Sequence, residues 1–253
     1  MSEVLFEANN GVAVITINRP DAKNAVNLAV SEGVAAGLDE IARRDDIMIG
    51  VITGAGGAFC AGMDLKAFLR GEVVKLKDKG FAGITQATLA KPMIAAVEGY
   101  ALGGGFEIAI ACDLIVAAET ARFGLPEVKR GLVANAGGLV RLPFQLPSRI
   151  AAEFVLTGDL IEPARLLQYG LINKVTKEGE ALSAAKDLAA RIAANGPLAI
   201  AASRRVMAES RDWSRDELFE RQAAITGAVF TSQDAKEGAR AFAEKRKPVW
   251  RGV

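Results

Sequence analysis

Near its middle the chain reads Lys91-Pro-Met-Ile-Ala-Ala-Val-Glu-Gly-Tyr-Ala-Leu-Gly-Gly-Gly-Phe-Glu107. The apolar run Met93–Val97 predicts a buried strand, and the three glycines at 103–105 stand between that strand and a predicted helix. Glycine lets a backbone approach a ligand closely, and the N–H groups at the start of a helix favour negative charge. The segment therefore predicts either a place where a substrate oxygen gains charge or a tight contact between helix and strand.

Strands and helices alternate around this segment. Asn27 has the side chain of a helix cap, and apolar residues at helical spacing predict a helix over 28–43. The uncharged run Ile47–Met63 is shorter than the ~20 residues that a membrane span needs. Its glycines divide it into a buried strand, a glycine loop and a second short strand. Further strands are predicted over 12–18 and 114–117. This alternation predicts a layered α/β fold with buried strands.

Helix signals dominate beyond residue 148. Ser214 and Glu217 have the spacing of a capping box, and Gly196 and Pro197 separate two of the helical segments. The predicted helices cover 148–156, 163–169, 180–194, 197–210, 214–230 and 233–245. The last of these are amphipathic, so we interpret them as a packing or oligomer element rather than as a separate domain.

The composition excludes several classes of function. The 253 residues include no histidine, which rules out Ser-His and Cys-His catalysis and every metal site that contains histidine. Basic and acidic residues number 31 and 30, so the net charge of +1 gives no reason to expect nucleic acid or a membrane surface as partner. The N-terminus lacks the basic start and apolar core of a signal peptide, so we expect a cytoplasmic protein.

A second glycine-rich segment follows the strand in the run 47–63. It reads Gly56-Gly-Ala-Phe-Cys-Ala-Gly-Met-Asp-Leu65 and fits neither the dinucleotide fingerprint nor a P-loop, because Met63 stands where the P-loop needs lysine. A functional backbone and a flexible surface loop both remain open interpretations. Cys60, within the segment, is expected to be a small buried residue.

Two glutamates are candidates for acid and base chemistry. Glu107 lies just inside the helix that the glycines begin, and Glu127 follows Phe123-Gly-Leu-Pro126. Two glutamates in apolar surroundings that face one substrate can divide acid and base work between them, because their repulsion separates their titrations. The alternative is that each is solvated or salt-bridged, with Lys129 or Arg130 as the partner of Glu127.

Several segments together resemble the enoyl-CoA hydratase/isomerase (crotonase) superfamily, over nearly the whole chain and in the family's order. They are Asn18-Arg-Pro-Asp-Ala-Lys-Asn-Ala25, Val51-Ile-Thr-Gly54, Phe59-Cys-Ala-Gly-Met-Asp-Leu65, Lys91 to Gly105, Phe123-Gly-Leu-Pro-Glu127, Leu156-Thr-Gly-Asp159, Gly170-Leu-Ile-Asn-Lys-Val175 and 234–246. Phe106, Arg141-Leu-Pro143 and Pro248-Val-Trp250 are similar to the carnitinyl-CoA dehydratase branch.

The resemblance implies a crotonase-type spiral of ββα units over residues 1–195 and a helical C-terminal oligomerisation region over 196–253. It implies a homotrimer, or a homohexamer built as a dimer of trimers. The substrate would be an acyl-CoA thioester, with no metal and with no cofactor beyond the coenzyme A that belongs to the substrate. The family's oxyanion hole, made of two backbone N–H groups, would fall on Met63 and Gly104. Coenzyme A would lie along Lys23, Ala25, Ala61, Asp64, Leu65 and Lys66.

The resemblance also suggests a reaction. Hydratase-type members carry two glutamates, and Glu107 and Glu127 match both, so we expect water to be added across a 2,3-double bond. Glu107 would activate the water and Glu127 would protonate C2, with the reverse assignment open. The alternatives are an isomerase, which is expected to lose the earlier glutamate, a carnitinyl-CoA dehydratase, and a catalytically silent CoA-binding oligomer. Ala134-Asn135 departs from the common pattern near the acyl end, which leaves the acyl preference open.

Overall fold

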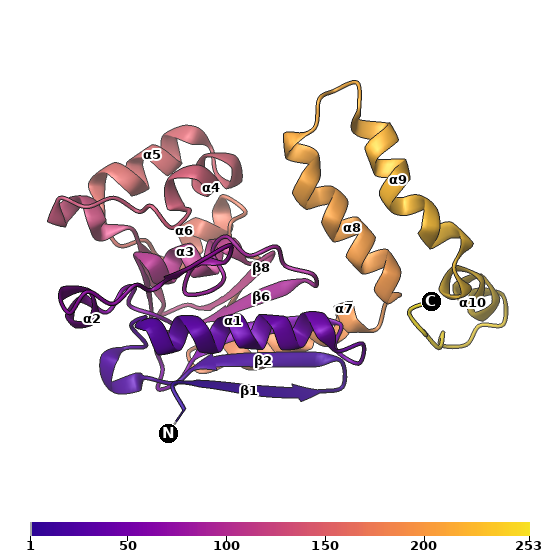
Figure 1. Cartoon of the computed structure of the whole chain (residues 1–253), viewed down its shortest axis with the longest axis horizontal. Coiled ribbons are helices and arrows are strands. Elements are labelled where there is room, and N and C mark those ends of the chain that lie inside the picture. Colours follow the sequence, from indigo (N-terminus) through magenta and orange to yellow (C-terminus); the bar gives the residue numbers. More distant parts are fainter. Residues whose placement is uncertain (1) are drawn as a thin grey trace.

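A six-stranded sheet forms the centre of the computed structural model, which describes residues 2–253 (Figure 1). The strands follow the order β1-β2-β3-β6-β8-β10. Their bounds are β1 (Val4–Asn9), β2 (Val12–Ile17), β3 (Ile49–Gly54), β6 (Met93–Val97), β8 (Leu114–Ala118) and β10 (Lys174–Thr176). Strands β1 and β2 form an antiparallel hairpin, and the other neighbours in the sheet are parallel. The predicted mixed α/β architecture is confirmed.

Both faces of the central strands β2, β3, β6 and β8 are buried, because alternate residues of each of these strands enter different cores. In β2, Ala13 and Ile15 face one core, whereas Val12 and Val14 face the other. Helix α1 (Leu28–Arg43) supplies apolar side chains to the first core, and α7 (Ala181–Ala193) supplies alanines to the second. The sheet is therefore sandwiched between these two helices (Figure 1).

A second, smaller layer of strands lies beyond the ends of the main sheet. Strand β7 (Tyr100–Leu102) pairs in parallel with β9 (Arg122–Gly124), and Cys60 forms an isolated parallel bridge to Ala101. Since Ala101 is also in register with Phe123, the three residues Cys60, Ala101 and Phe123 stand in one row. Each follows a strand of the main sheet and precedes a helical segment, which gives three successive turns of a spiral. These segments are α2 (Leu65–Leu69), α3 (Gly104–Ala111) and the 3-10 helix η2 (Pro126–Arg130).

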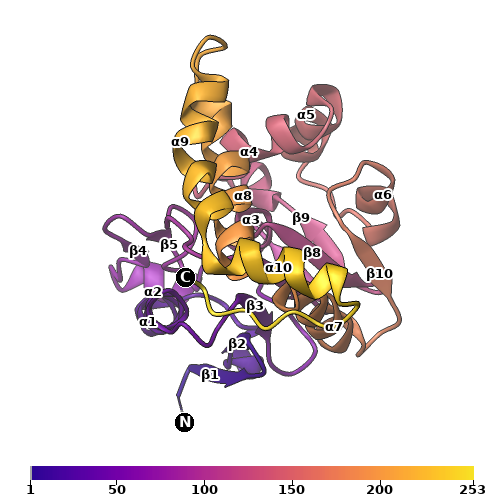
Figure 2. The ribbon, with the colours of Figure 1, turned by 90° about the vertical axis from the view of Figure 1, so that its right-hand side faces the viewer.

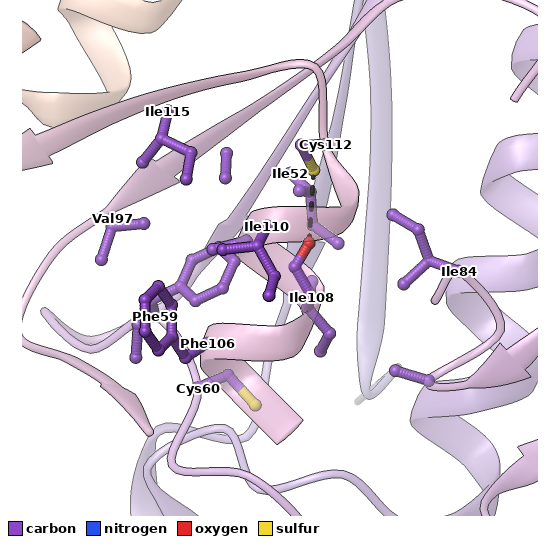
Figure 3. Close-up of a cluster of buried hydrophobic side chains, with 14 of the residues drawn as sticks. Ile52, Phe59, Cys60, Ile84, Val97, Phe106, Ile108, Ile110, Cys112 and Ile115 are labelled. Carbon is purple, nitrogen blue, oxygen red and sulfur yellow. Dashed lines mark hydrogen bonds between the residues drawn. The ribbon is translucent and has the colours of Figure 1, made fainter. Parts of the chain in front are cut away.

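Helix α3 lies inside the main core. Its residues from Gly104 to Ile110 are all buried, and Phe106, Ile108 and Ile110 spread into the surrounding apolar cluster (Figure 3). The ring of Phe106 meets Phe123 edge to face, with the ring centroids 5.3 Å apart. Burial on every side of the helix leaves Glu107, its one charged residue, 2% exposed.

The C-terminal helices form an arm that stands away from the sheet (Figure 1, Figure 2). They are α8 (Pro197–Glu209), α9 (Leu218–Thr231) and α10 (Gln233–Ala243). Arg204 of α8 pairs at 2.9 Å with Asp113, which directly precedes β8, and the indole of Trp250 donates to the carbonyl of Ala194 at 2.9 Å. These contacts fix the direction of the arm. No helix within residues 2–253 is long and apolar enough to cross a membrane.

The remaining elements complete the chain around this frame. Helices α4 (Gly138–Gln145), α5 (Ser148–Thr157) and α6 (Pro163–Gln168) follow η2, and the short strands β4 (Lys75–Leu76) and β5 (Gly80–Phe81) pair with each other. Two further 3-10 helices are η1 (Pro20–Ala22) and η3 (Ser210–Asp212).

Two local predictions are wrong. The second short strand within 47–63 is reduced to two isolated bridges, Cys60 with Ala101 and Met63 with Val26. The capping box at Ser214 does not form either. The Ser214 hydroxyl donates to the Glu217 carboxylate at 2.7 Å instead of capping the backbone, and α9 begins only at Leu218.

Candidate functional site

The spiral explains why residues distant in sequence meet at one place. Cys60, Ala101 and Phe123 stand in a parallel row, and the chain runs the same way through each of them. Residues that follow members of such a row emerge at the same edge. Met63 and Gly104 each come three residues after their member of the row, and Glu127 comes four residues after Phe123. The structure thus brings the predicted N–H donors and the predicted glutamates to one edge.

The backbone N–H groups of Met63 and Gly104, both at this edge, have no acceptor in residues 2–253. Gly104 is the first residue of α3, so its N–H has no partner within the helix. Met63 lies beside it, since a Cβ added to the preceding Gly62 would come within 3.4 Å of the Gly104 nitrogen. Phe81 packs directly on Gly104, where an added Cβ would meet the ring at 2.4 Å. This pair of donors can stabilise an oxygen that becomes negative.

Glu107 projects from the first turn of α3 into a nearly dry environment. Its Oε1 accepts the N–H of Gly138 at 2.8 Å. Burial raises the pKa of Glu107 to about 7, and the charge of Glu127 adds to the rise. The N–H of Gly138 and the guanidinium of Arg141 oppose it. Glu107 can therefore gain or lose a proton near neutral pH.

Glu127 lies against the glycine turn that begins α3. A Cβ added to Gly103 would lie 2.9 Å from its Oε1, and its buried Oε2 has no hydrogen-bond partner in the described part of the chain. Burial also raises the pKa of Glu127. Lys129 does not pair with it, because Lys129 contacts Asp159 at 2.5 Å. A carboxyl oxygen without a partner, next to the turn that presents the Gly104 N–H, is placed to bind a water molecule or a polar substrate atom.

The segments expected to follow coenzyme A lie next to these groups. The N–H of Ala61 donates to the carbonyl of Lys23 at 3.0 Å, which joins the two segments. Lys23 is exposed, with its ammonium 5.2 Å from the centre of the Tyr100 ring. Leu65 and Lys66 are exposed at the start of α2, and Ala25 is half-buried.

Asp64 has a structural task in this arrangement. Its Oδ1 accepts the N–H groups of Lys66 and Ala67 at 3.0 and 3.1 Å, which caps α2. Its Oδ2 pairs with Arg19 at 3.0 Å. Both carboxylate oxygens of Asp64, a residue that the resemblance places along coenzyme A, therefore already have partners.

Three residues around the site were not identified from the sequence as site residues. Phe81 packs on Gly104, and no periodicity marks its segment. Arg141 donates to the Thr85 carbonyl at 2.5 Å and acts on Glu107 by its charge. Asn24 is fully buried at φ +56°, donates to the carbonyl oxygens of Ala55 and Ala58, and so holds the loop before Ala25. The sequence signal that could have identified Asn24 is its position in the segment 18–25, which resembles the family.

The two cysteines are not nucleophiles here. Cys60 and Cys112 are free and buried, and burial raises the pKa of the Cys60 thiol to about 12. A thiol in that state carries almost no thiolate at neutral pH. The interpretation of Cys60 as a small buried residue is confirmed.

The buried carboxyl of Glu107 should make stability depend on pH. Its raised pKa favours the protonated form in the folded state, so this stability is complete below the unfolded pKa near 4.5 and is lost as pH rises through about 7. Glu107→Gln cannot ionise. We expect its free energy of unfolding, relative to wild type, to improve by about 2–3 kcal/mol between pH 5 and pH 8.5, measured by urea unfolding.

The matched control is Glu178→Gln, because Glu178 is exposed. Its stability difference from wild type should stay constant between the two pH values. A Glu107→Gln difference that is equally constant would contradict a buried, high-pKa carboxyl at this position.

Comparison with known proteins identifies a consistent set of relatives. The profile of the family described as Enoyl-CoA hydratase/isomerase matches residues 7–253. A carnitinyl-CoA dehydratase of Salmonella paratyphi A is 41% identical over 261 residues, with all of both chains covered. The crystal structure of an enoyl-CoA hydratase from Mycobacterium tuberculosis H37Rv superposes with a TM-score of 0.98 at 54% identity, again over all of both chains. A carnitinyl-CoA hydratase from Mycobacterium avium gives a TM-score of 0.80 at 47% identity with the same coverage.

Proposed function

Because the chain belongs to the enoyl-CoA hydratase/isomerase family, we propose that it is an enoyl-CoA hydratase, which adds water reversibly across the 2,3-double bond of a 2-enoyl-CoA thioester. One observation carries the proposal: two carboxyl groups with raised pKa values, Glu107 and Glu127, lie beside two backbone N–H groups without acceptors. Water addition needs one proton taken from oxygen and one given to carbon, and two carboxyl groups meet both needs.

The two N–H groups would hold the thioester oxygen. When oxygen attacks C3, the electrons of the double bond move through C2 to the thioester oxygen, which becomes an enolate oxygen. The N–H groups of Met63 and Gly104 stabilise that charge, and a well-placed donor of this kind contributes about 2.7–4 kcal/mol. The positive end of α3, which begins at Gly104, has the same effect.

The two glutamates would move the protons. The pair begins with one proton, carried by Glu127. The ionised Glu107 takes a proton from the water molecule as its oxygen forms the bond to C3, and the protonated Glu127 gives its proton to C2 as the enolate collapses. One O–H bond breaks and one C–H bond forms, so the pair ends the reaction with the proton count it began with. The steps use no metal and no redox cofactor, and coenzyme A enters only as part of the substrate.

Coenzyme A would lie over the joined segments that contain Lys23, Ala25, Ala61 and Asp64 to Lys66. Lys23 and Lys66 are exposed cations on that surface, which suits the phosphates of the coenzyme. Leu65 is half exposed and offers an apolar contact for the pantetheine chain. Asp64 would contribute through the shape of α2, because its carboxylate caps that helix.

The second candidate is a carnitinyl-CoA dehydratase, because relatives with that name match the whole chain. Arg141, whose guanidinium acts on Glu107 by its charge, belongs to a segment that resembles this branch, so it does not separate the two candidates.

A panel of thioesters tests the proposal. We expect the purified protein to hydrate crotonyl-CoA, measured as loss of the absorbance of the conjugated thioester. Migration of the double bond in a 3-enoyl-CoA without hydration would point to an isomerase, and turnover of carnitinyl-CoA alone would point to the second candidate. Binding of thioesters with no turnover of any would replace the proposal by a silent CoA-binding oligomer.

The protein is further proposed to assemble as a homotrimer or homohexamer through its C-terminal arm. Neither α8 nor α9 contains a buried residue, and Phe219, Phe230 and Phe242 are 80–88% exposed. A cavity of about 600 Å³ also opens between these two helices and residues 88–90. Exposed apolar surface of this extent marks an interface. Light scattering should give three or six times the 26.6 kDa of the chain, and a monomeric mass would contradict the assembly.

A further inference from the structure

The direction of the Met63 N–H is set by an isolated bridge. Val26 donates its N–H to the carbonyl of Gly62 at 2.8 Å and accepts the N–H of Asp64 at 2.9 Å. In a parallel bridge the residue between the two bonded neighbours turns its own N–H away from the partner. Met63 therefore presents its N–H on the side opposite Val26, where Gly104 lies. Any shift of Val26 relative to Met63 would turn the donor.

Arg19 holds both sides of this bridge. One guanidinium nitrogen donates to the carbonyl of Ala25 at 2.5 Å, and another pairs with Asp64 Oδ2 at 3.0 Å. Ala25 directly precedes Val26, and Asp64 directly follows Met63. The Arg19 and Asp64 side chains are 18% and 13% exposed, so water screens the pair weakly. The third nitrogen, Nε, pairs with Glu3 at 3.3 Å.

The state of Asp64 fits this task. Burial raises the pKa of Asp64, but the N–H of Ala67 and the guanidinium of Arg19 outweigh it, so the net pKa is lowered. The ionised carboxylate thus binds α2 through one oxygen and Arg19 through the other. The start of α2 and the loop at Ala25 are joined through a single guanidinium.

We propose that Arg19 is a positioning residue for the oxyanion hole, which fixes the Met63 N–H through Ala25 and Asp64 without touching the substrate. This inference rests on the proposed function, because it assumes that Met63 binds the thioester oxygen. A planar guanidinium can hold two acceptors at a fixed separation, whereas a lysine ammonium is a single flexible point charge. The role therefore depends on arginine rather than on positive charge alone.

The principal test is Arg19→Met, which keeps the length of the side chain and removes every donor. We expect kcat for crotonyl-CoA to fall about 10–10²-fold, since a displacement of about 1 Å in a reacting geometry can cost 10²-fold. The kcat of Arg19→Lys should lie between those of Arg19→Met and wild type. The matched control is Arg165→Met, which removes a half-buried arginine whose two terminal nitrogens both pair with a single carboxylate, that of Glu153. Its kcat should equal that of wild type.

A spectroscopic measurement separates positioning from a general loss of structure. An aryl-acryloyl-CoA with an electron-donating amino group absorbs at longer wavelength when its carbonyl oxygen is polarised. We expect a red shift on binding to wild type and to Arg165→Met, and a smaller shift with Arg19→Met at saturating ligand. If Arg19→Met does not fold, Arg19→Lys and Asp64→Asn carry the same measurement, and both should reduce the shift.

The outcomes distinguish the two proposals. Wild-type kcat and a full red shift in Arg19→Met would overturn the positioning role and leave the hydratase proposal standing. A red shift in wild type without turnover of any thioester would remove the hydratase proposal, and the comparison of shifts would still decide the role of Arg19. A wild type that binds the probe with no shift would overturn the role outright.

Discussion

Replacing Glu107 by glutamine should lower kcat for the hydration of crotonyl-CoA by about 10²–10⁴-fold, the usual contribution of a general acid or base. Glutamine has nearly the same shape, and its carbonyl oxygen can still accept the N–H of Gly138 that Oε1 accepts in wild type. It cannot take a proton from water. KM should therefore change little while kcat falls, as steady-state kinetics at pH 7 would measure.

Glu127→Gln should lower kcat by a similar factor, because the enolate then lacks its proton donor. The double variant should lose little more than the worse single variant, since the two groups act on one reaction as a unit. The control is Glu178→Gln, an exposed glutamate whose replacement should leave kcat unchanged. Wild-type rates in both single variants would contradict the two-glutamate mechanism.

The parts of the fold that were predicted correctly are those with local causes. Helix α1 begins where Asn27 accepts the N–H of Val30 at 3.0 Å, and its apolar face repeats along the chain. Strands β3, β6 and β8 are continuous apolar runs and were found for that reason, although β3 begins two residues later than predicted. Periodicity and capping are contained within a few residues of sequence.

The N-terminal hairpin was missed although a local signal exists. Asn10 and Gly11 join β1 to β2 with φ values of 50° and 80°, the conformation that Asn-Gly adopts in a two-residue hairpin turn. Strands β7 and β9 have no such signal, because three residues are too few to show a period. Their pairing, which aligns Met63, Gly104 and Glu127, arises from the spiral as a whole.

The residues of the candidate site also fall into two groups, those in local motifs and those that act through contacts distant in sequence. Its glutamates and glycines stand in short motifs that resemble those of the family, so the sequence was enough to nominate them as candidates. The residues that hold the motifs in place are distant: Arg19 reaches Asp64 across 45 positions, and Arg141 reaches Thr85 across 56. Contacts of this kind depend on the folded chain, and no spacing rule predicts them.

Replacing Gly104 by alanine should lower kcat by about 10²–10³-fold, the cost of losing one oxyanion donor. The backbone of Gly104 is in an ordinary helical conformation, so the cause would be space rather than strain. A Cβ would lie 2.4 and 2.5 Å from Cε1 and Cζ of Phe81. Either the ring or the first turn of α3 must move, and a movement of the turn carries the Gly104 N–H away from the substrate oxygen.

Phe81→Leu provides a way to test this cause, because leucine has no atoms beyond its δ carbons and the Phe81 Cδ1 is 3.2 Å from the added Cβ. Gly104→Ala should therefore cost less in kcat when it is introduced into Phe81→Leu than when it is introduced into wild type. Gly196→Ala is the matched control, since a Cβ there meets Trp250 at an ordinary 3.8 Å and should leave kcat unchanged. The contrary result is that Gly104→Ala keeps the wild-type kcat even with Phe81 in place. Gly104 could then not be the donor, and the charge on the thioester oxygen would have to be stabilised by other groups.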